Sequence, residues 1–287
     1  MNRYKTKANK LFDRFRKKVN SSSPLKIESA YIEKIKAASG LYVFNSEIEE
    51  IKVSGECVIE QSYIHHIIAN QKIRLLDEVN IGTLIAMSEV EAEGCLIKVF
   101  RNCNSRGNSE SKTNKVKGEI VAITYENYTS SVLDYDFHYT NILNKYFLEC
   151  EKAIECHYFI SFAPFYIPKI KADVMFIRPY FNTFVEVLEA NTLWIENKLH
   201  NKDLMDEIPS ICDFRELVNK QFETSKMRVE KIKAKDLVIE NCDAMLIQVE
   251  NIVVKENCQI ERLEVSGTYE IHKSSHVVQL YVGGVQV

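Results

Sequence analysis

The sequence predicts an all-β protein: a parallel β-solenoid of triangular coils, each about 16 residues long, with inserted loops and a short helix. Two observations support this fold class. An apolar template with offsets 0, +3, +5, +9 and +11 fits four successive stretches, which start at residues 32, 48, 64 and 81. The same template returns in the C-terminal half of the chain. A fixed repeat of this kind indicates one small structural unit stacked many times.

In the N-terminal block, all twenty template positions hold apolar residues. They are Ile32, Ile35, Ala37, Leu41, Val43, Ile48, Ile51, Val53, Cys57, Ile59, Ile64, Ile67, Ala69, Ile73, Leu75, Ile81, Leu84, Ala86, Val90 and Ala92. Positions two residues apart share one face of a β-strand, so the template is typical of short strands. The +5 position holds only alanine or valine, which indicates a tight interior corner. The sequence has neither the longer apolar stripes of helical repeats nor the Asn-Gly hairpin turns of a sandwich.

In the C-terminal block, the second pair of the template comes one residue earlier. Its coils start at residues 167, 185, 229, 244, 260 and 277, and the last of them is partial. The partial coil contains Val277, Leu280 and Val282.

The breaks in the repeat define four regions. We expect an N-terminal arm at 1–24, a solenoid block at 25–100, a loop and irregular insert at 101–163, and a second solenoid block at 164–287. Within the insert, GEIVAITYENY predicts one degenerate coil, while the segment that follows fits either a helix or strands. The second block is interrupted at 198–227, where Phe214, Leu217, Val218 and Phe222 have the spacing of a short helix.

The N-terminal arm is strongly basic and has apolar residues with helical spacing. Its candidate membrane-binding residues are Lys10, Leu11, Phe12, Arg14, Phe15, Arg16, Lys17 and Lys18. Such a helix would place its apolar face in the lipid boundary and its cations on anionic headgroups. A solvated basic tail and a helix that caps the first coil remain equally open alternatives.

Composition excludes several classes of protein. Lysine and arginine total 37 against 40 acidic residues, a formal net charge of -3, so the chain as a whole does not resemble a nucleic-acid binder. No apolar run approaches the roughly 18 residues that span a bilayer. Eight scattered cysteines without an export signal predict reduced thiols in a cytoplasmic protein.

The sequence contains no recognisable catalytic motif. We find no Walker loop, no GxGxxG, no GxSxG and no HExxH, and nine glycines leave little material for phosphate loops. His65 and His66 are interpreted as surface histidines rather than metal ligands. We therefore predict no catalytic, cofactor or metal site, and no enzyme activity.

Two segments of the repeat resemble a known family. VVKENCQIERLEV (253–265), within residues 234–282, is similar to the terminal solenoid of the longer Gram-positive bactofilins, and IKVSGECVIE (51–60) resembles their N-terminal coils. Bactofilins are polymer-forming cytoskeletal proteins of bacteria. The resemblance implies a nucleotide-independent scaffold on the inner face of the cell membrane that recruits other proteins. Usual bactofilin coils are richer in glycine and lack large inserts.

Function is expected at the solenoid ends. Val277, Leu280 and Val282 at one end, with Ile32 and Ile35 at the other, are the predicted self-assembly residues, since open strand edges pair with other chains. The alternative is a non-polymerising adaptor that binds a partner protein through its inserts. Solenoid enzymes fit less well, because acyltransferases need strict six-residue spacing and pectin-cleaving enzymes need clustered acidic residues.

Overall fold

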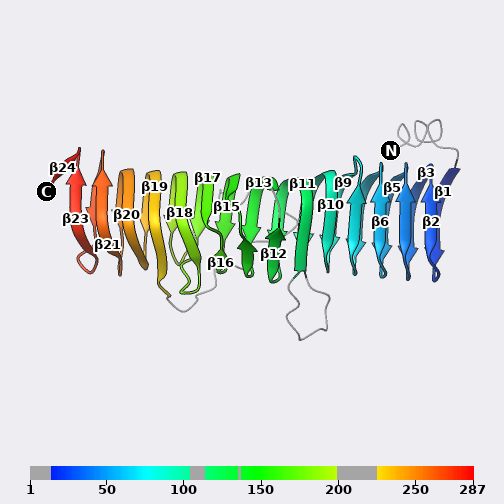
Figure 1. Ribbon diagram of the computed structural model, residues 1–287, viewed down its shortest axis with the longest axis horizontal. Helices are drawn as coiled ribbons and strands as arrows, with labels where there is room; N and C mark the ends of the chain where they lie inside the picture. Colours follow the sequence, from blue (N-terminus) through cyan, green and yellow to red (C-terminus); the bar gives the residue numbers. More distant parts are fainter. Residues whose placement is uncertain (1–13, 104–113, 135–136, 199–224) are drawn as a thin grey trace. The chain divides into compact units, whose positions relative to one another are not determined.

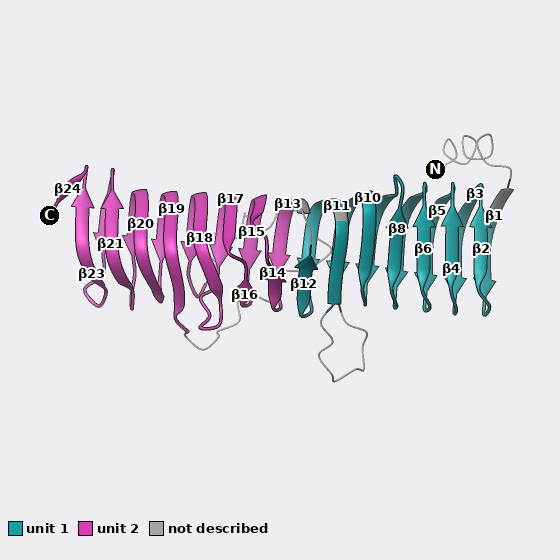
Figure 2. Cartoon of the chain, in the orientation of Figure 1, with its two compact units in different colours: residues 1–138 teal, residues 139–287 magenta. Residues whose placement is uncertain are grey.

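The computed structural model describes residues 14–103, 114–134, 137–198 and 225–287. In these ranges all elements are β-strands, and the ladders between coils are parallel, which confirms the predicted parallel β-solenoid (Figure 1). The chain divides into two compact units, residues 1–138 and 139–287 (Figure 2). The described ranges contain no helix that is long and apolar enough to cross a membrane.

The described residues of unit 1 contain twelve complete strands, and longer and shorter ones alternate from β1 to β9. They are β1 (Arg14–Ser21), β2 (Leu25–Glu28), β3 (Ala30–Ala37), β4 (Leu41–Phe44), β5 (Glu47–Val53), β6 (Cys57–Glu60), β7 (Tyr63–Ala69), β8 (Ile73–Leu76), β9 (Asn80–Ala86), β10 (Val90–Asn102), β11 (Asn114–Asn127) and β12 (Ser131–Asp134). Each longer strand pairs with the longer strand of the next coil, as β3 does with β5 and β5 with β7. The shorter strands β4, β6 and β8 form a second parallel ladder.

The core of unit 1 consists of identical template positions stacked coil upon coil. Ile48 pairs with Ile32 on one side and with Ile64 on the other. All twenty template residues are at most 3% exposed, which confirms the predicted register. Full burial of one such aliphatic side chain contributes about 1.5 to 3 kcal/mol, so the stack is the main source of stability.

Each longer strand of unit 1 bends at one residue, which makes the coil triangular. The ladder joining β3, β5 and β7 omits Glu33, Glu49 and His65. Ile48 and Ile51 lie on either side of this bend and are both buried, although a straight strand would point residues three apart to opposite faces. The two halves of the longer strand and the shorter strand therefore form the three faces.

The turns that lead into the longer strands also repeat. Ser29, Asn45 and Gln61 occupy equivalent positions with φ between 45° and 47°, a left-handed conformation that asparagine adopts more readily than most residues. The next residue after Asn45 is the buried Ser46. Its hydroxyl accepts a hydrogen bond from the Ala30 amide (3.2 Å) and donates one to the Phe44 carbonyl (2.8 Å). The Ser46 hydroxyl thus satisfies a backbone amide of the preceding coil and a backbone carbonyl of its own turn.

Unit 2 continues the same architecture, and β13 (Phe137–Asn144) spans the boundary between the units. Its other strands are β14 (Leu148–Cys150), β15 (Ile154–Ser161), β16 (Phe165–Tyr166), β17 (Lys169–Ile177), β18 (Phe184–Ile195), β19 (Met227–Ile239), β20 (Cys242–Val254), β21 (Gln259–Val265), β22 (Tyr269–Ile271), β23 (His276–Val282) and β24 (Val285–Gln286). Leu188 of β18 pairs directly with Ile232 of β19. Strands β18 and β19, on either side of the predicted interruption, therefore pair in register as neighbouring coils.

The structure corrects the prediction of an irregular insert at 101–163. From Asn114 onward this region forms strands β11 to β15, and the described part contains no helix. The apolar template does not fit this region, because some interior positions of the region hold polar residues. In unit 1, the buried Asn102 amide donates to Ser131 Oγ at 2.9 Å. In unit 2, the Asn144 amide donates to Ser161 Oγ at 2.9 Å.

The predicted helix of the N-terminal arm is also wrong from residue 14 onward. Residues 14–21 form β1, whose Phe15 and Val19 pair with Tyr31 and Ile35 of β3. The first coil therefore begins about one repeat earlier than expected. Lys10, Leu11 and Phe12 lie outside the described residues, as does the helix expected around Phe214, Leu217, Val218 and Phe222.

Candidate self-association site

The last coil of unit 2 leaves its apolar interior uncovered. Leu280 of β23 is half-buried, whereas its partner Leu263 in the preceding coil is fully buried. Tyr269 of β22 is 45% exposed, whereas its partner Ile252 is 2% exposed. We call this surface the terminal face. It consists of Tyr269, Ile271, Val277, Leu280 and Val282.

The outer edge of β23 is only partly protected. At Gly283 and Gly284, with φ of 58° and 86°, the chain reverses and β24 pairs antiparallel with Tyr281 and Val282 (Figure 1). The Val287 amide also donates to the Leu280 carbonyl at 2.9 Å. This short hairpin covers part of a strand edge that the sequence predicts to be open. Among the described residues, the edge from His276 to Gln279 has no further strand beside it.

The hairpin adds apolar surface rather than removing it. Val285 is 69% exposed and Val287 is 76% exposed, and Val278 on the uncovered edge is 53% exposed. A Gly-Gly pair between β-branched residues is a recognised hairpin signal, so the sequence did contain evidence for this turn.

Charged groups lie beside the terminal face and are paired with one another. Arg262 Nη2 lies 2.5 Å from Glu264 Oε1, and the Arg262 guanidinium lies 4.5 Å from the centre of the Tyr281 ring. A hydrogen bond from Gln248, together with Arg262, lowers the pKa of Glu264 below its ordinary value. Neither partner of this ion pair belongs to the terminal face.

The predicted N-terminal contact residues are not at a solenoid end. Ile32 and Ile35 are 1% and 0% exposed, because β1 stacks on β3 and covers them. The positions of β1 that correspond to Ile32 and Ala37 are Arg16 and Ser21, both polar. The described N-terminal coil is therefore polar at two template positions, and at the other three it carries Val19, Leu25 and Ile27.

The basic residues proposed for membrane contact are only partly described. Arg16, Lys17 and Lys18 are exposed on β1. Arg14 and Phe15 belong to the backbone of the same strand, opposite Ala30 and Tyr31 of β3. The structure thus brings three cations to one strand but does not present them on a helix.

Six of the seven described cysteines are buried, and Cys103 is half-buried. None of the seven forms a disulfide, and Cys57 is 1% exposed, as expected for a template position. Burial raises the pKa of the Cys57 thiol to about 12, and it also raises the pKa of Cys242. A thiol that resists ionisation is a poor nucleophile and a poor metal ligand.

Comparison with family models, with curated proteins and with solved structures found no match to this chain.

Proposed function

We propose that this chain is a structural scaffold whose copies associate through the terminal face. The observation that carries this proposal is the exposure of Leu280 and the other four residues of the terminal face, whose paired residues in the coil directly before are at most 3% exposed. Side chains whose partners in the preceding coil are buried are left without a covering coil at this end. Another protein surface would supply the missing cover.

The strand edge supports the same proposal. A parallel solenoid presents unpaired backbone amides and carbonyls at its last coil, and such edges template pairing with further strands. Between His276 and Gln279 the outer edge of β23 remains available for this pairing. Apolar contact would supply the driving force and backbone hydrogen bonds would set the register.

The resemblance of residues 51–60 and 234–282 to bactofilins favours a scaffold over an adaptor. On this proposal the chain assembles without nucleotide and carries out no reaction of its own. Its exposed basic strand β1 would hold it against an anionic membrane surface, and further proteins would be recruited to the assembly.

The test compares two lysine substitutions in β23. Leu280→Lys places a charge in the terminal face, where association would have to desolvate it at a cost of several kcal/mol. Gln279→Lys places the same charge one residue away on an exposed outward position. By sedimentation velocity at matched concentrations, we expect Leu280→Lys to remain folded but to lose association, and Gln279→Lys to associate like the wild type.

Two outcomes would contradict the proposal. One is equal association of the Leu280→Lys variant and the wild type, which would exclude the terminal face as the contact. The other is a wild-type protein that stays monomeric at all concentrations, with and without anionic vesicles. That result would favour the adaptor, which binds a different protein and not a second copy.

A further inference from the structure

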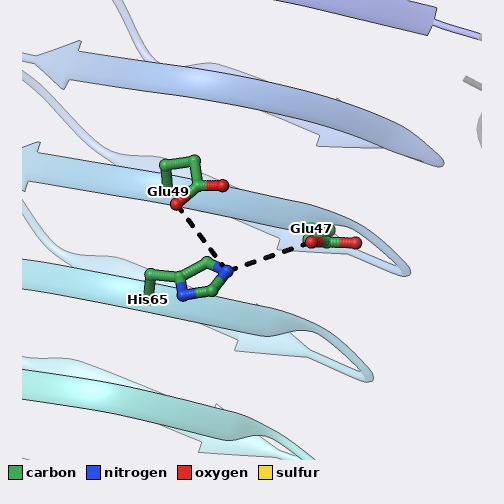
Figure 3. A group of neighbouring side chains, drawn as sticks. All are labelled: Glu47, Glu49 and His65. Atoms are coloured by element: carbon green, nitrogen blue, oxygen red, sulfur yellow. Dashed lines mark ion pairs between the residues drawn. The ribbon is translucent and has the colours of Figure 1, made fainter. Parts of the chain in front are cut away.

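Three potential metal ligands meet on the surface of unit 1. Glu47 and Glu49 lie two residues apart on β5, and His65 lies on β7 of the next coil (Figure 3). The Nε2 atom of His65 is 3.9 Å from Glu47 Oε1 and 3.7 Å from Glu49 Oε2. All three ligand atoms lie within 4.8 Å of one another.

Coil stacking explains why these residues meet. Glu49 and His65 occupy the bend of β5 and of β7, where the backbone ladder omits one residue and side chains point outward. Glu47 precedes Glu49 by two residues and shares its face. This cluster was not identified from the sequence, because His65 lies one coil repeat after Glu49 and no short ligand motif contains the three residues.

Two tyrosines hold the ligands in place. The Tyr31 hydroxyl donates a hydrogen bond of 2.7 Å to Glu49 Oε1, which leaves Oε2 directed at His65. The Tyr63 ring meets the His65 ring edge-on, with centroids 4.7 Å apart. Outer contacts of this kind orient the ligands of metal sites in proteins.

The charge of this cluster differs from that of the neighbouring surface. Glu50 is paired with Lys34 and with Lys52 (3.2 Å), and the hydrogen bond from Lys34 contributes most to lowering its pKa. By contrast, within the described ranges the ion pairs of Glu47 and Glu49 are with His65 alone. Within the described ranges these two carboxylates therefore have no lysine or arginine partner.

We propose that Glu47, Glu49 and His65 bind a divalent transition-metal ion of the zinc class. One imidazole nitrogen and two carboxylate oxygens form a ligand set suited to zinc, whereas calcium and magnesium prefer oxygen alone. Ligands of tetrahedral zinc lie about 3.3 Å apart at bonds of 2.0 to 2.1 Å. Small rotations of these exposed side chains bring the three atoms to that spacing, and a water molecule completes the site.

Access to the fourth coordination position is open. The bend of the next coil carries Gly82, which places no side chain beside His65. A Cβ atom at this position would lie only 2.5 Å from the His65 carbonyl oxygen, so a larger residue is excluded there. The metal would therefore remain accessible to water or to an external ligand.

The test is calorimetric titration of the reduced protein with zinc chloride. We expect about one high-affinity site in the wild type, and affinity at least about 10-fold weaker in His65→Asn and in Glu49→Gln, as for loss of a metal contact. The control is His66→Asn, which removes the adjacent histidine and should bind zinc like the wild type.

Cobalt substitution provides an independent readout. A site of one imidazole and two carboxylates gives weak visible bands without the intense absorption of cobalt–thiolate bonds. Thiolate absorption, absence of zinc binding in the wild type, or unchanged binding in His65→Asn would each overturn the proposal. Melting curves recorded without metal establish that the variants fold.

Discussion

At the scale of single residues, the small side chain that ends each of the strands β3, β5, β7 and β9 determines how closely the coils turn. Ala69 is fully buried and pairs with Val53 of the preceding coil and with Ala86 of the following one. The backbone enters a turn directly after it. There is no space for a larger side chain at this position, because neighbouring coils cover it on both sides.

Ala69→Leu should therefore destabilise the protein through overpacking. We expect the free energy of unfolding to fall by about 1 to 3 kcal/mol, measured by chemical denaturation. Ala38→Leu is the matched control, since Ala38 is exposed in the turn after β3 and the change should cost less than about 0.5 kcal/mol. Equal losses in the two variants would contradict the assigned interior position.

A second prediction concerns the irregular pairing of β10 with β11. Gly118 has a φ of 101°, and a Cβ atom built on it would lie 1.7 Å from the Ala92 carbonyl oxygen. Gly118→Ala must displace the backbone, so we expect it to lower the melting temperature more than Gly94→Ala does. Gly94 has a φ of 63° but open space around it, so alanine there costs only the left-handed conformation, about 1 to 2 kcal/mol. The reverse order would contradict this account.

At the scale of elements, the sequence predicts strands well wherever the interior is apolar. The template positions between Ile32 and Ala92 are all in the core. The same reasoning predicted one degenerate coil where β11 lies but did not establish β12 to β15. In this region Asn102 of β10 and Asn144 of β13 fill interior positions and bond to serines of the next coil. These amide side chains are polar, yet they belong to the interior of the solenoid because they bond between coils. A search for apolar positions therefore cannot distinguish a coil that contains them from a loop.

The N-terminal strand shows the same limit. The spacing of the apolar residues in 11–19 fits a helix. Residues 14–21 instead form β1, and pairing with β3 satisfies the backbone of β1 and covers Ile32 and Ile35. Deleting residues 1–20 would therefore expose core side chains. Such a deletion cannot separate membrane binding from folding.

Charge substitution on β1 separates the two effects. Replacing Arg16, Lys17 and Lys18 together with glutamine keeps the strand but removes three exposed cations. Each basic residue near an anionic surface contributes about 1 kcal/mol, so we expect roughly 100-fold weaker binding to vesicles containing phosphatidylserine, measured by co-sedimentation. Lys36→Gln with Lys98→Gln, both exposed in unit 1, should bind like the wild type. Unchanged binding of the triple variant would remove β1 from the membrane contact.

At the scale of the whole molecule, the first and last described coils differ in chemistry. Arg16 and Ser21 make the N-terminal coil polar at two template positions, whereas every template position of the terminal face is apolar. Association is therefore expected to begin at the terminal face. If two copies meet through the same face, the contact is closed and gives a dimer, and growth beyond the dimer requires a second interface.

The most direct test of self-association is the molar mass of the wild-type chain as a function of concentration. Sedimentation equilibrium of the reduced protein should show a monomer of 33.2 kDa at low concentration and a reversible rise to twice that mass or more as concentration increases. The mass of Leu280→Lys should stay at that of the monomer over the same range. A wild-type mass that remains at the monomer value at every concentration would contradict the account.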